Sequence, residues 1–173
     1  IWGVLHNGIK LYKDSINVLD KLEQSKKEYI LLTNAPRPNN TVINFLKNLG
    51  LDQSKCKKVS TSGEVALKYL KSKYKALKFF HVGPPRDFDL FKSFEEFKVN
   101  SLDESDFIIC TGLYENFSKN LDYYKDLLKN KVDKKMVCTN PDLVVDRGSN
   151  REFCAGSVAK IFEDLGGEVE YFG

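Results

Sequence analysis

Three short polar clusters each follow an apolar run, and such positions can carry ligand-binding side chains in α/β proteins. They are His6-Asn7-Gly8, Thr33-Asn34 and Cys138-Thr139-Asn140-Pro141-Asp142. In the second cluster, the Thr33 hydroxyl and the Asn34 amide are followed by backbone N–H groups, a combination that can hold a phosphate or a carboxylate. Taken alone, the same two residues equally suit an ordinary cap and turn.

Two interpretations are also open for His6 and for the pair Gly156-Ser157. His6 can serve as a general acid or base, or it can be a polar residue of a β-hairpin whose turn is Asn7-Gly8. Gly156-Ser157 stands at a predicted helix start, where N–H groups can face an anion or simply be capped. The sequence has no Ser/His/Asp set, Walker-type loop or GxGxxG motif. Residue chemistry alone therefore predicts an α/β protein with an anion site.

Composition narrows the function classes. The net charge of +3 comes mainly from dispersed lysines, which favours a solvated surface over a nucleic-acid footprint. No apolar run is long enough to cross a membrane, so we expect no membrane partner. With two histidines and four cysteines that form no CxxC pair, a histidine-based zinc site is not expected, and the protein is predicted to be cytoplasmic. Arginine is limited to four positions that form no cluster in the sequence: Arg37, Arg86, Arg147 and Arg151.

Strand-like and helix-like segments alternate along the chain, which is typical of an α/β fold. The pattern restarts after a lysine-rich stretch at 71–78, and we expect a domain boundary near residues 75–78. Thr61 and Glu64 have the spacing of a capping box. The predicted strands are 1–5, 29–32, 79–82, 107–110, 136–138 and 168–172, and the predicted helices begin near Ser15, Val42, Thr61, Leu121 and Val158.

Six motifs occur in a defined order over nearly the whole chain: residues 1–8, 31–37, 60–64, 138–142, 154–157 and 171–173. In this order they resemble the haloacid dehalogenase superfamily, specifically its branch with a type-two α/β cap. That branch includes p-nitrophenyl phosphatases, phosphoglycolate phosphatases, pyridoxal phosphatases and relatives acting on ribonucleotides or sugars.

The resemblance assigns roles to the first motif, which in the family reads Asp-x-Asp-Gly. Gly3 matches its glycine, so the nucleophilic aspartate is expected immediately before Ile1. Trp2 stands at the general acid/base position, a departure because an indole N–H does not exchange a proton near pH 7. The Trp2 backbone carbonyl can still be a magnesium ligand, and His6 is a candidate substitute for the acid.

The resemblance also implies a phosphate site and a substrate-selecting segment. Thr33 matches the residue that holds the transferring phosphoryl group, with Asn34 and Gly3 beside it. The cap segment is expected to close over the substrate through Asn140, Asp142, Arg147 and Gly156. The family's third-motif lysine is expected just after Gly173.

The implied architecture is a partial Rossmann-like core with an inserted α/β cap. Residues 1–76 are expected in the core, residues 77–167 in the cap, and residues 168–173 in a strand returning to the core. The implied function is a Mg²⁺-dependent phosphatase that hydrolyses a small phosphorylated metabolite through an aspartyl-phosphate. The resemblance further implies that the cap can mediate a homodimer.

Two alternatives stay open at this point. Because Trp2 replaces the acid, the protein could instead be a catalytically weak or inactive phosphometabolite-binding protein on the same scaffold. If the motif matches are chance, it could be an unrelated flavodoxin-like or Rossmann-like binding domain. That last alternative predicts one continuous sheet instead of two separate α/β units.

Overall fold

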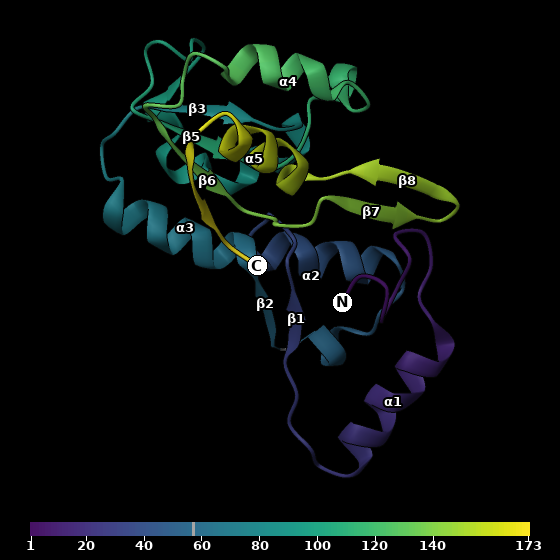
Figure 1. Ribbon diagram of the computed structural model, residues 1–173. Coiled ribbons are helices and arrows are strands. Elements are labelled where there is room, and N and C mark those ends of the chain that lie inside the picture. The colour runs from purple at the N-terminus through teal and green to yellow at the C-terminus, as the bar shows by residue number, and fades with distance from the viewer. Residues whose placement is uncertain (57) are drawn as a thin grey trace.

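The computed structural model describes residues 1–56 and 58–173 and has a mixed α/β architecture, as the sequence predicts (Figure 1). Its strands form two separate parallel sheets and one antiparallel hairpin. The alternative of one continuous sheet is therefore wrong. No helix within the described ranges is long and apolar enough to cross a membrane.

The first α/β unit is built on a two-stranded parallel sheet of β1 (Leu31–Thr33) and β2 (Val59–Thr61). Helices α1 (Lys13–Gln24) and α2 (Asn39–Asn48) accompany it, followed by the 3₁₀ turn η1 (Gln53–Cys56). Apolar side chains of these elements form one core, because each helix turns one apolar face inward. That core includes Leu19, Leu31, Val42, Leu46 and Val59.

The second unit contains a five-stranded parallel sheet in the order β4-β3-β5-β6-β9. Its strands are β3 (Phe79–Val82), β4 (Lys98–Val99), β5 (Phe107–Cys110), β6 (Lys135–Cys138) and β9 (Glu168–Tyr171). The central strands are buried on both faces and read as continuous apolar runs, as parallel strands usually do.

Helices cover both faces of this sheet (Figure 1). On one face lie α4 (Leu121–Leu128), preceded by η4 (Glu115–Phe117), and α5 (Ala155–Asp164). On the other lie the two 3₁₀ turns η2 (Pro85–Leu90) and η3 (Lys92–Phe97) together with α3 (Ser62–Lys73), whose Leu70 joins their core. The Thr61 hydroxyl caps α3 by accepting from the Glu64 N–H at 3.0 Å, which confirms one half of the predicted capping box. The other half is not formed, because the Thr61 N–H donates to Asn39 Oδ1 at 3.0 Å.

A β-hairpin emerges from the second unit over the amino-terminal segment of the first (Figure 1). It consists of β7 (Val144–Arg147) and β8 (Asn150–Phe153), and the Gly148 N–H reaches the carbonyl oxygen of Asn7 at 3.4 Å. The family resemblance implies a closing role for this segment, but its two strands are not among the predicted ones. Gly148 has φ of +61°, which glycine adopts at no steric cost in such a turn.

Two expected strands differ in the structure. In place of the expected strand at residues 1–5, Gly3–Leu5 form a turn, because the carbonyl oxygen of Ile1 accepts from the N–H groups of Val4 and Leu5, and Trp2 makes only an isolated bridge with His6. Residues 168–173 were expected to return to the core, but β9 pairs with β6 at the edge of the five-stranded sheet. Its apolar positions serve that sheet, since Val169 packs on the core formed with α4 and α5. Only the chain end approaches the first unit: a Cβ on Gly173 would lie 3.1 Å from Asn34 Cβ.

Candidate functional site

A cavity of about 770 Å³ lies between the two α/β units. Its lining comes from the segments that follow β1, β3, β5 and β6, together with the β7–β8 hairpin. Parallel strands present their ligand-binding loops at their carboxyl ends, so this location agrees with a binding site shared by both sheets. A smaller hollow of about 400 Å³ also includes Ile1, Trp2, Thr33 and Asn34 in its lining, along with Gly173.

Thr33 and Asn34 line the cavity at the carboxyl end of β1, where the sequence places the phosphate site. The Thr33 hydroxyl oxygen accepts from the Ala35 N–H at 3.3 Å, which leaves its proton free for a ligand. The Asn34 amide donates to Asp142 Oδ2 at 2.6 Å and lies 3.4 Å from Asn140 Oδ1. The fold thus brings together four of the predicted site residues, two from each unit.

Trp2 also lines the cavity, but its side chain makes structural contacts. The indole N–H donates to the carbonyl oxygen of Asp146 in β7 at 3.0 Å. The Arg147 guanidinium lies 5.1 Å from the ring centroid, within range of a cation–π interaction. A Cβ at Gly8 would lie 2.5 Å from the indole ring, so glycine is required beneath it. The residue at the expected acid/base position therefore connects the first unit to the hairpin.

His6 lines the same cavity and is 2% exposed. Its Nδ1 accepts from the Gly8 N–H at 2.9 Å, which assigns the proton of the neutral ring to Nε2. Burial lowers the pKa of His6, and the positive charge on Arg147 adds to that effect. The neutral form is thus favoured near pH 7, and it can donate a hydrogen bond without being a strong acid.

Two predicted site residues do not line the cavity. Gly3 gives its N–H to the carbonyl oxygen of His6 at 2.8 Å, so this donor is not free for a phosphate. Gly156 is buried at the start of α5, where a Cβ would lie 2.1 Å from the carbonyl oxygen of Pro141. Gly156 is needed for close packing of α5 on the loop that carries Asn140 and Asp142.

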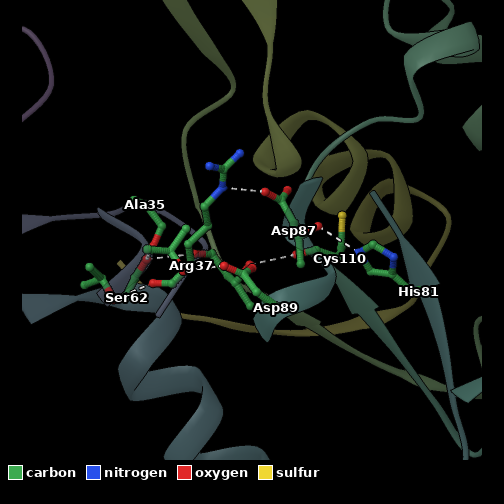
Figure 2. A network of polar contacts seen from close by, with 11 residues as sticks. Ala35, Arg37, Ser62, His81, Asp87, Asp89 and Cys110 are labelled. Atoms are coloured by element: carbon green, nitrogen blue, oxygen red, sulfur yellow. Dashed lines mark hydrogen bonds and ion pairs between the residues drawn. The ribbon is translucent and has the colours of Figure 1, made fainter. Parts of the chain in front are cut away.

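A polar network joins the two units beside the cavity (Figure 2). The Arg37 Nε–H donates to Asp87 Oδ1 at 2.8 Å, and the Ser62 hydroxyl donates to the carbonyl oxygen of Thr139 at 2.8 Å. Asp87 is 3% exposed, and burial raises its pKa while Arg37 opposes the rise. The ion pair holds η2 against the loop that follows β1.

Sequence reasoning missed one feature of the cavity, the clustering of arginine. Arg37, Arg86, Arg147 and Arg151 are dispersed along the chain, yet all four line this cavity. Only Arg147 was predicted as a site residue. A usable signal was present, since Arg37 and Arg86 each follow closely on a predicted strand, at the end where parallel sheets bind ligands.

The residues present were tested for a magnesium site through their donor sets. Within residues 1–56 and 58–173, no group of three or more His, Cys, Asp or Glu side chains could hold a metal ion. Trp2 contributes no carboxylate, and Asp87 and Asp142 are bonded to Arg37 and Asn34. The described residues do not by themselves provide a magnesium site.

The chain is similar to several solved structures. A haloacid dehalogenase-like hydrolase from Brucella suis matches with a TM-score of 0.88 and 29% identity, over 98% of this chain and 65% of that one. A 4-nitrophenylphosphatase from Thermotoga maritima matches with a TM-score of 0.69 and 22% identity, over 99% and 65%. A p-nitrophenyl phosphatase from Archaeoglobus fulgidus matches with a TM-score of 0.70 and 16% identity, over 99% and 65%. The chain thus spans 65% of the length of each of these three structures.

No curated protein matches the sequence. The family described as haloacid dehalogenase-like hydrolase matches residues 1–95, more than half of the chain, and this match includes the segment from Trp2 to Arg37 and the η2 turn. Together with the two-unit architecture and the shared cavity, this match shows that the chain belongs to the haloacid dehalogenase-like hydrolases.

Proposed function

We propose that the full-length protein is a phosphatase that hydrolyses a small phosphorylated metabolite. The observation that carries the proposal is the placement of Thr33 and Asn34 at the end of β1, facing an arginine-lined cavity between two α/β units. Hydroxyl, amide and guanidinium groups are donors suited to phosphate oxygens. Family membership and the names of the phosphatases with the same fold support the same class of reaction.

The proposed nucleophile is an aspartate immediately before Ile1. The Ile1 nitrogen donates to the carbonyl oxygen of Leu32 at 2.9 Å, which places this part of the chain beside the end of β1. In-line attack by the aspartate on phosphorus would form an aspartyl-phosphate and release the alcohol, and water would then hydrolyse the intermediate. The Thr33 hydroxyl would orient the phosphoryl group.

Magnesium is proposed as the cofactor from the family alone. The described residues do not complete its site, so its acidic ligands are expected elsewhere in the full-length protein. The approach of Gly173 to Asn34 supports the proposal that the residues after it, including a lysine, enter the same site.

The proposal has a direct test on the full-length protein. Turnover of p-nitrophenyl phosphate is expected with Mg²⁺ and is expected to be lost when the aspartate before Ile1 is replaced by asparagine. Thr33→Val should lower kcat about tenfold or more, because it removes a hydrogen bond to a charged group, whereas Thr33→Ser keeps the hydroxyl and should stay within a few-fold. A residue other than aspartate before Ile1 would rule out the covalent mechanism.

A second candidate is a phosphometabolite-binding protein with little or no hydrolysis. The specific observation in its favour is Trp2, whose indole is bonded to Asp146 where the family resemblance expects an acid. General acid–base help is typically worth about 10²–10⁴-fold, so a poor leaving group would depart slowly without it. Phosphate-ester binding without turnover in the presence of Mg²⁺ would favour this candidate.

The remaining proposals concern the domain division, the cellular location, the binding partners and the oligomeric state. We propose a domain division near residues 76–77, a cytoplasmic location, no nucleic-acid or membrane partner, and a homodimer formed through the cap. The described cysteines are all free, which supports a reducing compartment. Light scattering of the full-length protein, with and without the cap residues 77–167, tests the dimer.

A further inference from the structure

The lining of the cavity is enriched in arginine relative to lysine. All four arginines of the chain line it, whereas among the described lysines Lys119 alone does so. The guanidinium group is planar and offers donors that match a carboxylate or phosphate in bidentate fashion, which lysine does not. Concentration of the chain's arginines at one place therefore points to recognition of anionic groups there.

The four guanidinium groups differ in what they already bind. Arg151 is engaged through two nitrogens with Asp146, at 2.8 and 3.2 Å. Arg147 and Arg37 each use Nε only, with Glu152 at 3.2 Å and Asp87 at 2.8 Å. In the part of the chain that the structure describes, Arg86 forms no hydrogen bond or ion pair.

Two of the four lining carboxylates are already paired with an arginine, and a third accepts a hydrogen bond from an amide. Asp87 is paired with Arg37, Glu152 with Arg147, and Asp142 accepts from Asn34. Glu115 is the fourth lining acid, and Lys119, four positions later in the sequence, also lines the cavity. Among the described residues, Arg86 is paired with none of these four carboxylates, so its guanidinium can bind a ligand.

The positive charge of Arg86 acts on the same side chains as the charges of Arg37 and Arg147. Burial raises the pKa of Asp87, and both Arg37 and Arg86 oppose that rise. Burial also raises the pKa of Cys154 to about 11, with Arg147 and Arg86 opposing it. Arg86 and Asp87 are neighbours in η2, and both line the cavity together with Cys154.

This position is separate from the phosphoryl site. Thr33 and Asn34 follow β1 in the first unit, whereas Arg86 lies in η2, which follows β3 in the second unit. The Arg37 side chain reaches between the two, since it comes from the loop after β1 and bonds to Asp87 next to Arg86. A ligand with two anionic groups could therefore meet donors from both units in one cavity.

We propose that Arg86, with the unbonded Nη groups of Arg37, forms a second anion subsite that selects phosphorylated metabolites carrying a further acidic group. The inference rests on the proposed function, because it names the substrate class of the same cavity. The Thr33 hydroxyl holds the phosphoryl group that is transferred, while the Asn34 amide stays bonded to Asn140 and Asp142. Arg86 holds the carboxylate or second phosphate.

The test compares two substrates that differ at one group. 3-Phosphoglycerate carries a carboxylate where glycerol 3-phosphate carries a hydroxymethyl group. The full-length protein is expected to show a higher kcat/KM for 3-phosphoglycerate, and Arg86→Gln should lower that value about 10- to 100-fold, as expected for losing a hydrogen-bonded charge pair. The values for glycerol 3-phosphate and p-nitrophenyl phosphate should stay within about twofold.

Arg151→Gln is the matched control, because Arg151 lines the same cavity but is engaged with Asp146. It should change the ratio of the two substrates by less than about twofold. An equal loss for all three substrates in Arg86→Gln would overturn the inference, since Arg86 would then act on the transferred phosphoryl group. Lack of preference for the acid would also overturn it.

Failure of the proposed function gives a different result. If no substrate is turned over, calorimetric titration with the same two compounds still tests the subsite. Tighter binding of 3-phosphoglycerate that is lost in Arg86→Gln would support the subsite in a non-hydrolysing protein. Equal binding of both compounds would overturn it.

Discussion

The guanidinium of Arg37 donates through Nε to Asp87 Oδ1 at 2.8 Å and thereby links the loop after β1 to η2 of the second unit. The two partners differ in solvation, because the Arg37 side chain is 26% exposed and that of Asp87 is 4% exposed. Removing Arg37 and removing Asp87 are therefore expected to change the stability of the protein by different amounts. The pair stabilises the arrangement of the two units around the cavity.

Arg37→Gln should destabilise the protein more than Asp87→Asn. Without Arg37, a buried carboxylate loses its charge partner, and such losses cost about 3–5 kcal/mol. Without the Asp87 charge, the arginine can still reach water, so a loss of about 1–2 kcal/mol is expected. Urea unfolding of both variants measures the difference, and a larger effect of Asp87→Asn would contradict this asymmetry.

Trp2→Phe should loosen the β7–β8 hairpin. The variant keeps an aromatic ring near Arg147 but loses the indole hydrogen bond to the Asp146 carbonyl. A net loss of about 1 kcal/mol is expected, which corresponds to roughly fivefold faster hydrogen exchange of hairpin amides if they exchange by local opening. Tyr12→Phe removes a hydroxyl from the same amino-terminal segment and should leave the exchange unchanged. Equal exchange in both variants would show that the bond does not hold the hairpin.

His81 should make the protein acid-sensitive. It is 5% exposed, and burial lowers its pKa to about 3, with a smaller contribution from Lys98. Between pH 6.5 and 3 the unfolded chain binds a proton that the folded chain does not, so stability falls as pH falls through this window.

The expected loss between pH 7 and pH 5 is about 2 kcal/mol. His81→Gln can keep a hydrogen bond to Thr111 but does not titrate, so its unfolding free energy should fall by about 2 kcal/mol less over the same range. Urea unfolding at the two pH values measures this difference. Identical pH dependence in both proteins would mean that His81 is protonated when folded.

Gly63→Ala should destabilise the protein despite the higher helix propensity of alanine. Gly63 lies in the first turn of α3, where a Cβ would be 2.3 Å from the Arg37 backbone nitrogen. Its N–H also donates to the carbonyl oxygen of Ala35 at 3.0 Å. Overpacking of this kind typically costs about 1–3 kcal/mol. Lys71→Ala, on the exposed part of the same helix, is the control and should be nearly neutral. A thermal melt of both variants tests the prediction, which fails if Gly63→Ala is as stable as the control.

The sequence by itself determined the α/β class, most strands of the five-stranded sheet and the cap of α3. These features depend on local patterns: buried parallel strands read as apolar runs, and the Thr61 hydroxyl needs only the N–H three residues later. The family motifs also placed Thr33 and Asn34 correctly at the end of a strand. All of these features are set by short segments of the sequence.

Tertiary structure alone decided which residues face the cavity. Gly3 and Gly156 match family motifs, but backbone contacts with His6 and Pro141 occupy them, and such contacts depend on how the chain returns. The apolar pattern of β9 would suit either sheet. Its pairing with β6, which places it in the five-stranded sheet, is therefore seen only in the tertiary structure. Arg86 is separated from Arg37 by 49 positions, and the two guanidinium groups share one cavity only because parallel strands from two sheets end at the same place.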